Sequence, residues 1–336
     1  MDETIGNTTL FLVYGSFTAF NLLSSTVLRL LGVYRTLLFS SFSYVLFTLV
    51  LIHPIPFFLY PIAVICGCCA ATLWTGMGTY LAGEVEAHDL VNGLVVYSSV
   101  GSFNGIFFGV NMFSFAFGNL VAAVFFEVDV GEDLIFLLMA VIVGFGSLSL
   151  LFLKVPPKDT TEETGITKHV PRFATTQLLE TLNMSLKNGT MKHLILPFIT
   201  TGATKSFIWG NIPPLIHQQN TKFYVMAFNG LSAAVFSVIF GRLAKRYGSV
   251  YVTFNVFPFL LTICCVIYFL VGSGGEGDSS LAIVWWASGV LGLVDGSLTT
   301  LSNAMVGELF PKQKEAGFAT MVRRETEVVV EGAFSW

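Results

Sequence analysis

Two charged residues in apolar surroundings, Lys205 and Asp295, are the first candidates for chemistry in this sequence. Lys205 follows Thr204 in "ITTGATKSFIWG", and Asp295 lies in "LGLVDGSLTT". An ammonium and a carboxylate held away from bulk water can bind a substrate or an ion, or gate a pathway. They can equally form a structural pair or be hydrated separately in a polar cavity. Both interpretations stay open, with hydroxyl groups such as that of Thr204 as further polar partners.

The stretch "CGCCAATLWTGMGTYLAGE" (Cys66–Glu84) has three cysteines in four positions and a Gly-Met-Gly segment. Such residues are compatible with a metal or redox site, or with half of a phosphate-binding loop. No second motif supplies further metal ligands, so we expect free thiols that pack as small hydrophobic groups, and no metal. Gly67, Gly76 and Gly78 are expected to let helices approach closely. Trp74 is a candidate for the wall of a cavity.

The five histidines form no nucleophile or metal constellation, because they lie at the ends of apolar segments or between them. They are His53, His88, His169, His193 and His217. We therefore expect no enzyme activity and no cofactor.

The elements that hold these residues are long apolar segments. The chain has 336 residues, of which 54% are hydrophobic and 11% charged, whereas soluble domains have about 25% charged residues. About 20 apolar residues cross a bilayer as a helix. We expect an all-α polytopic membrane protein with nine spans, at Thr8–Leu28, Tyr34–Ile52, Phe57–Leu81, Ser102–Phe126, Leu134–Leu153, Leu194–Ile216, Phe223–Gly241, Val250–Val271 and Leu281–Val306.

The basic residues gather on one side of these spans. Of the 17 Lys and Arg residues, all except Lys205 and Lys222 fall in alternate loops or in the tail. Since cytoplasmic loops hold the excess of Lys and Arg, these loops are expected to be cytoplasmic. Two of them are short basic turns around a glycine, made by Arg29, Gly32 and Arg35 and by Arg242, Lys245, Arg246 and Gly248. The net charge of −4 gives no basis for nucleic-acid binding.

The two basic turns indicate an internal repeat. Gly32 aligns with Gly248 at an offset of 216 residues, and "YLAGE" at Tyr80–Glu84 aligns with "AMVGE" at Ala304–Glu308 at an offset of 224. Two parallel halves joined by a cytoplasmic linker are typical of the major facilitator fold. We expect an N-terminal half at 1–153, a linker with an amphipathic surface helix at 154–192, a partial C-terminal half at 193–306 and an atypical cytoplasmic tail at 307–336.

That fold has twelve helices, six in each half. Counting outward from the repeat makes the first span helix two and the ninth span helix ten, so helices one, eleven and twelve are expected to be missing. The segment "FATMVRRETEVVVEGAFSW" after Gly317 is too charged for a typical membrane span.

Four segments carry a family resemblance. They are "YGSFTAFNLLSS" (Tyr14–Ser25), "CGCCAATLWTGMGTYL" (Cys66–Leu81), "FGNL" (Phe117–Leu120) and "LGLVDGSLTT" (Leu291–Thr300). In these segments the sequence resembles the Unc-ninety-three-like family of the major facilitator superfamily. The resemblance implies a non-enzymatic multi-pass protein that regulates or accompanies other membrane proteins, including potassium channels and innate immune receptors.

Two functions are therefore expected from the sequence. The first is an accessory or regulatory partner of other membrane proteins such as ion channels, embedded in the lipid bilayer of the plasma membrane or of an endomembrane. The alternative is a secondary transporter that moves a small solute or ion through a central cavity. In the major facilitator fold, the spans that hold Trp74, Lys205 and Asp295 line that cavity.

Overall fold

The computed structural model describes residues 3–128, 130–153, 174–272 and 281–334. These residues form helices and connecting turns, without a β-strand. In chain order the α-helices are α1 (Glu3–Leu31), α2 (Val33–Val50), α3 (Pro56–Val91), α4 (Val100–Glu127), α5 (Glu132–Ser149), α6 (Ala174–Lys187), α7 (Gly189–Asn211), α8 (Gln219–Tyr247), α9 (Ser249–Gly272), α10 (Leu281–Leu309) and α11 (Lys314–Phe334).

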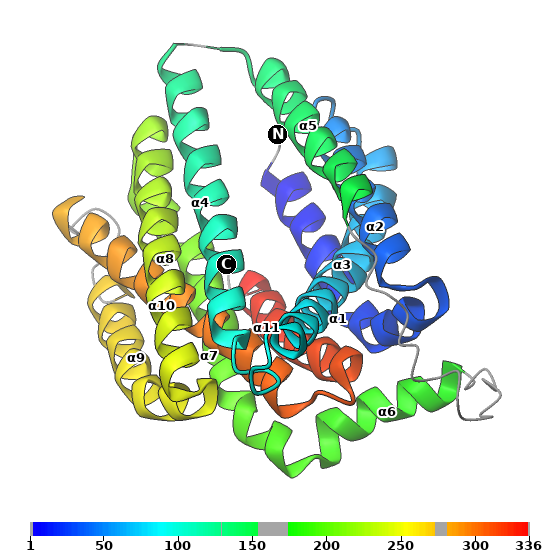
Figure 1. Ribbon diagram of the computed structural model, residues 1–336. Coiled ribbons are helices and arrows are strands. Elements are labelled where there is room, and N and C mark those ends of the chain that lie inside the picture. Colours follow the sequence, from blue (N-terminus) through cyan, green and yellow to red (C-terminus); the bar gives the residue numbers. More distant parts are fainter. Residues whose placement is uncertain (1–2, 129, 154–173, 273–280, 335–336) are drawn as a thin grey trace.

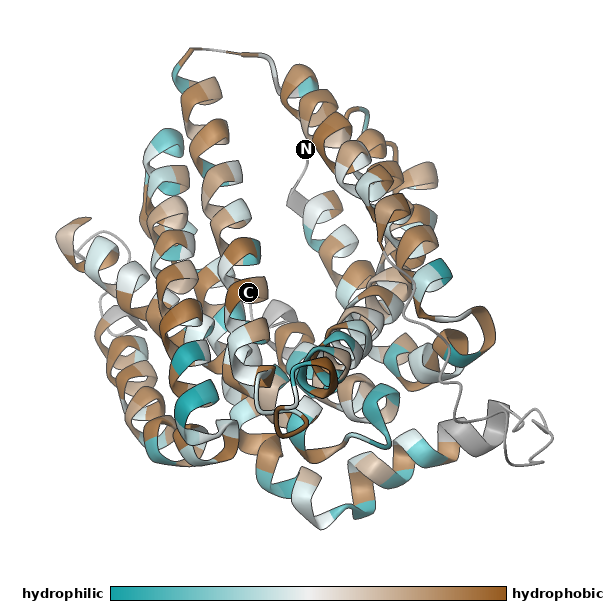
Figure 2. Cartoon of the chain, in the orientation of Figure 1, coloured by the Kyte–Doolittle hydropathy of each residue, from teal (hydrophilic) through white to brown (hydrophobic). Residues whose placement is uncertain are grey.

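Eight helices within the described residues are long and apolar enough to cross a membrane, namely α1, α2, α3, α4, α5, α8, α9 and α10. They coincide with eight of the nine expected spans, and the expected all-α polytopic class is confirmed. Figure 2 shows hydrophobic residues along most of their length.

The remaining expected span, Leu194–Ile216, covers most of α7 and the short turn after it. α7 is not among the eight apolar helices, because Lys192, Lys205 and several threonines make it more polar. The threonines Thr200, Thr201 and Thr204 are buried, so this polar surface faces protein.

The helices form two groups (Figure 1). In one group α1 and α2 pack against α3, and α5 packs against α2; in the other, α8 and α9 pack against α10. α4, which follows α3 in the chain, lies beside the second group and packs along α8, and α11 packs along α1 of the first group. α7 lies against α11 and α10. This arrangement brings α3, α7, α10 and α11 around a common centre.

The two basic turns have the same backbone geometry. Gly32 has φ of 81° and Gly248 has φ of 88°, values that favour glycine. The N–H of each glycine donates to the carbonyl four residues earlier at 2.8 Å, and its carbonyl accepts from the N–H four residues later at 3.1 Å. If the two halves of the chain are related, their basic turns are expected to share this backbone geometry. The division of the chain into halves stays a prediction.

The expectation for residues 307–336 needs a correction. Residues 314–334 form α11, which packs along α1 and α7 instead of leaving the bundle as a tail. Phe318, Ala319 and Met321 are among its buried side chains. The charges that argue against insertion are paired, since Arg323 and Arg324 lie 2.7 and 2.9 Å from Glu327. A helix of the bundle therefore does follow residue 306.

The expected surface helix of the linker is present as α6, which crosses one end of the bundle (Figure 1). Thr181 of α6 is buried, and its hydroxyl lies 2.9 Å from that of Ser25 on α1. Arg324 of α11 donates a hydrogen bond to Ser185 of α6 at 3.4 Å. α6 is thus fixed to α1 and α11. The linker residues 154–173 lie outside the described residues.

Candidate functional site

A central cavity of about 710 Å³ lies between the two groups of helices. Its wall includes three of the four residues proposed from the sequence, Trp74 on α3, Lys205 on α7 and Asp295 on α10. Thr204 is buried beside the cavity. Its hydroxyl donates to the carbonyl of Thr200 at 2.8 Å and lies 3.5 Å from Sγ of Cys264.

α7 brings Lys205 to the cavity on a helix whose buried threonines are hydrogen-bonded locally. The helix begins after Asn188, whose side chain accepts the N–H of Met191 at 3.0 Å. The hydroxyl of Thr201 donates to the carbonyl of Pro197 at 2.9 Å. Such bonds to the carbonyl four residues earlier keep a threonine satisfied within its own helix. Within the described residues, the ammonium of Lys205 has no such acceptor on its own helix and reaches across to α11.

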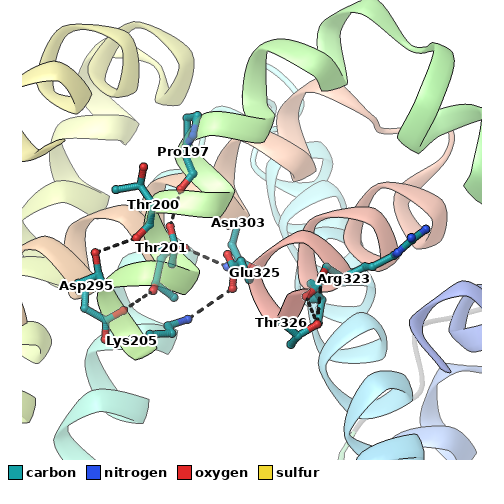
Figure 3. Close-up of polar contacts among 12 residues, drawn as sticks. Pro197, Thr200, Thr201, Lys205, Asp295, Asn303, Arg323, Glu325 and Thr326 are labelled. Atoms are coloured by element: carbon teal, nitrogen blue, oxygen red, sulfur yellow. Dashed lines mark hydrogen bonds and ion pairs between the residues drawn. The ribbon is translucent and has the colours of Figure 1, made fainter. Parts of the chain in front are cut away.

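Glu325 of α11 is the ion-pair partner of Lys205. Nζ of Lys205 lies 3.4 Å from Oε2 of Glu325 (Figure 3). A Lys205–Asp295 pair is one alternative that the sequence leaves open, and no ion pair within 4 Å joins these two in the described structure. Asp295 instead accepts a hydrogen bond from the hydroxyl of Thr299 at 3.1 Å. Lys205 therefore has one close carboxylate, with a second farther away in the same cavity.

Sequence reasoning misses Glu325 because the charged segment that holds it resembles a cytoplasmic tail. The signal that could have identified Glu325 is that the uncharged residues of this segment recur at helical spacing, as on one face of a helix. From Met321 onward the buried residues recur at helical spacing, at Met321, Val322, Glu325, Thr326 and Val329. Arg323, Arg324 and Glu327, which pair with one another, occupy the other side of α11. Pairing on one face hides the apolar character of the other.

The two carboxylates are almost fully buried. Asp295 is 6% exposed and Glu325 is 9% exposed. Oε1 of Glu325 is buried and has no hydrogen-bond partner in the described structure. A buried ionised oxygen without a donor is unfavourable, so this atom marks where a ligand or a proton would be stabilised.

Aromatic and small side chains complete the wall. Tyr14, Tyr44, Trp74 and Trp209 line the cavity together with the buried thiol of Cys66. The cysteines are free, and no group of three potential metal ligands occurs within the described residues.

The three glycines singled out on α3 lie at close contacts with other helices. A Cβ on Gly67 would overlap the backbone of α1 at Val13. A Cβ on Gly76 would lie 2.9 Å from the side chain of Leu28, and one on Gly78 would lie 2.5 Å from the ring of Phe318. Each position therefore accommodates a neighbouring helix and does not face a ligand.

The basic turns lie away from the cavity wall. Arg29, at the end of α1, contacts Glu180 of α6 at 3.4 Å and Glu315 of α11 at 3.5 Å. Arg246 lies 5.3 Å from the ring centre of Tyr247. The other basic side chains of these turns, Arg35, Arg242 and Lys245, are exposed. Arg29 thus links three helices, while the others face the surroundings.

Comparison with known proteins agrees with this architecture. The family model "Major Facilitator Superfamily" matches residues 3–324, a range that includes the first half of α11. The chain is 28% identical to "Protein unc-93 homolog A" of Bos taurus over 95% of this chain and 77% of that protein. It is 26% identical to "UNC93-like protein 3" of Arabidopsis thaliana over 96% of this chain and 71% of that protein.

A third relative, "UNC93-like protein MFSD11" of Xenopus tropicalis, is 24% identical over 94% of this chain and 77% of its own length. These relatives confirm the resemblance that the sequence motifs indicated. The chain is an integral multi-pass membrane protein that belongs to the major facilitator superfamily, and the relatives it is similar to are named UNC93 homologues or UNC93-like proteins.

Proposed function

We propose that this protein binds a small solute in its central cavity and carries it across the membrane. The observation that supports this function is the convergence of Lys205, Asp295 and Glu325, from three different helices, on one cavity. An ionisable residue at membrane depth costs at least about 2.5–3.5 kcal/mol on insertion scales. Packing alone would be served better by apolar side chains, so three such groups favour a role in ligand binding.

The helices that supply these residues suit a carrier. In transporters of this architecture the two halves rock around a site near the middle of the bilayer. Here α7, α10 and α11 place the charges on one side of the cavity, whereas α3 places Trp74 on another. A relative movement of the two sides would therefore change the surroundings of a bound solute.

Transport can be tested with a mixture of candidate solutes. Liposomes that contain the purified protein are incubated with a defined mixture of amino acids, sugars, amines and organic acids, and their contents are analysed by mass spectrometry. We expect at least one compound to accumulate with time and to saturate. Liposomes with the Lys205→Met/Glu325→Gln variant, and liposomes without protein, serve as controls. Equal contents in all three would contradict the proposal.

An accessory role in the membrane is the second candidate, and a groove that shares Trp74 and Val143 with the cavity wall favours it. An apolar groove of about 600 Å³ runs beside the cavity and is lined by residues of α2, α3, α4 and α5. Leu73, Val143 and Leu150 contribute to it. A transmembrane helix of another protein, such as an ion channel subunit, would bury its apolar face in this groove.

Photo-crosslinking tests the accessory role in intact membranes. A photoreactive amino acid at Leu150, in the groove, is expected to give one discrete adduct with a membrane protein. The matched control is Phe145 of α5, the helix that ends just before Leu150; Phe145 is 70% exposed and lies outside the groove. The substitution Gly146→Trp fills the groove and should abolish the adduct. An equal adduct pattern at Leu150 and Phe145 would argue against a docked partner.

A further inference from the structure

The positive and negative charges in the wall of the central cavity are unequal in number. Lys205 supplies one positive charge, and Asp295 and Glu325 supply two negative charges. The described wall contains no other Lys, Arg or His. With all three groups ionised, the cavity has one net negative charge, which is costly where water is scarce. A positively charged occupant would stabilise this wall, and an anion would be repelled.

Two carboxylate groups have acceptor atoms that remain available. Oε2 of Glu325 faces Lys205, while Oε1 is buried without a hydrogen-bond partner in the described structure. Asp295 accepts one hydrogen bond, from Thr299. Since a carboxylate can accept about four hydrogen bonds, both groups can receive donors from a ligand.

The rest of the wall favours a cation with an apolar body. Rings such as those of Tyr14, Trp74 and Trp209 can contact an ammonium group or its apolar substituents. The cavity of about 710 Å³ is within the usual range for organic ligands and far larger than one ion needs. A bare metal ion is a poorer fit, because no three His, Cys, Asp or Glu side chains of the described chain are grouped to hold one.

We propose that the central cavity binds a monovalent organic cation, with its protonated amine at Glu325 and Asp295 and its apolar body against the aromatic wall. The proposal rests on the solute-carrying function above and names the class of solute. Lys205 holds one oxygen of Glu325 and leaves the other for the ligand.

Three probes of nearly the same shape test this inference on the unmodified protein. Phenethylammonium is positive, phenethyl alcohol is neutral and hydrocinnamate is negative. Calorimetric titration into the protein in lipid nanodiscs, with empty nanodiscs as the reference, gives the three affinities. We expect the cation to bind at least about tenfold more tightly than the alcohol, the effect of a hydrogen bond to a charged group, and the anion not to bind. Equal affinities, or no binding of any probe because the site holds only a proton, would overturn the proposal.

Variants of the charged cavity residues test whether the preference for the cation arises in the cavity. Glu325→Gln and Asp295→Asn should each weaken cation binding about tenfold or more, while Lys205→Met should strengthen it by removing the competing positive charge. A purely structural role would not change affinity in opposite directions. The matched control is Glu127→Gln, since Glu127 lies at the end of α4 outside this cavity and accepts a hydrogen bond from Tyr224. The Glu127→Gln variant should bind phenethylammonium with the same affinity as the unmodified protein.

A milder variant keeps the test decisive if a charge change prevents folding. Thr299→Val removes the hydroxyl that donates to Asp295 without changing the net charge. We expect it to alter cation affinity and to leave the alcohol unaffected; an identical change for both probes would contradict the proposal. Binding and flux are separate readouts. Cation binding without any flux would refute the carrier function alone, whereas flux of an anion or a sugar without cation binding would refute the ligand class alone.

Discussion

At the scale of single residues, the partner of Lys205 determines how the cavity is held together. The ammonium lies 3.4 Å from Glu325, and only 20% and 12% of the two side chains are exposed. Removal of one member of a buried ion pair costs about 3–5 kcal/mol, because the remaining charge is left without its partner. Removal of both members avoids most of that cost.

We predict that Lys205→Met lowers the stability of the protein more than the double variant Lys205→Met/Glu325→Gln does. The alternative double variant, Lys205→Met/Asp295→Asn, should restore less of the lost stability. Asp295 forms no close ion pair with Lys205 in the described structure. Thermal unfolding of the purified protein in detergent measures each variant.

Lys192→Met is the control for this comparison, because Lys192 is an exposed lysine on the same helix. It should leave the unfolding temperature nearly unchanged. Equal rescue by the two double variants would show that Lys205 interacts with both acids alike, contrary to the ion pair of Figure 3.

At the scale of helices, the sequence predicts the eight apolar spans and also the more polar α7, whereas it predicts a cytoplasmic tail in place of α11. Spans such as α5 and α9 are read directly from the sequence, because their mean hydropathy is high and few of their side chains need polar partners inside the protein. α7 and α11 are surrounded by other helices, so their polar residues can be paired inside the protein. A hydropathy pattern contains no information about such pairing. Lys205 and Asp295 could be named from the sequence because each stands alone in an apolar segment, whereas Glu325 lies among other charged residues.

The turn between α8 and α9 gives a prediction at this scale. Gly248 has φ of 88° and ψ of 139°, a region that side chains with a Cβ rarely adopt. Gly248→Ala should lower the free energy of unfolding by about 1–3 kcal/mol. Denaturant or thermal unfolding in detergent measures the loss.

Gly118→Ala is the matched control, because Gly118 lies inside α4 and a Cβ there would meet no atom within 4 Å. It should be neutral or slightly stabilising, since alanine favours a helix over glycine. A loss at Gly118 as large as that at Gly248 would mean that backbone strain is not the cause.

At the scale of the whole molecule, one end of the bundle is closed by charged contacts. Arg29 joins α1 to α6 and α11, and Lys314 at the start of α11 lies 2.6 Å from Glu86 of α3. The exposed basic residues of the two turns lie at helix ends as well. The positive-inside rule assigns this end to the cytoplasm.

Thiol labelling of intact cells tests this orientation. In a variant without native cysteines, Leu179→Cys on α6 should react with a membrane-impermeant reagent only after permeabilisation. Val128→Cys, at the opposite end of α4, should react without it. Both positions are exposed, at 56% and 66%. Labelling of Leu179→Cys from outside would reverse the predicted orientation.

The unequal charges of the cavity also have an electrical consequence. With a monovalent cation bound, the site is neutral, and its movement across the bilayer is not affected by voltage. The empty site would move as one negative charge, which a membrane potential biases by about 2.3 kcal/mol per 100 mV when the charge crosses the whole field. A potential that is negative inside would therefore drive empty proteins to the outward-facing state. The step that returns the empty site, and not the step that carries the cation, is where voltage would set the direction of transport.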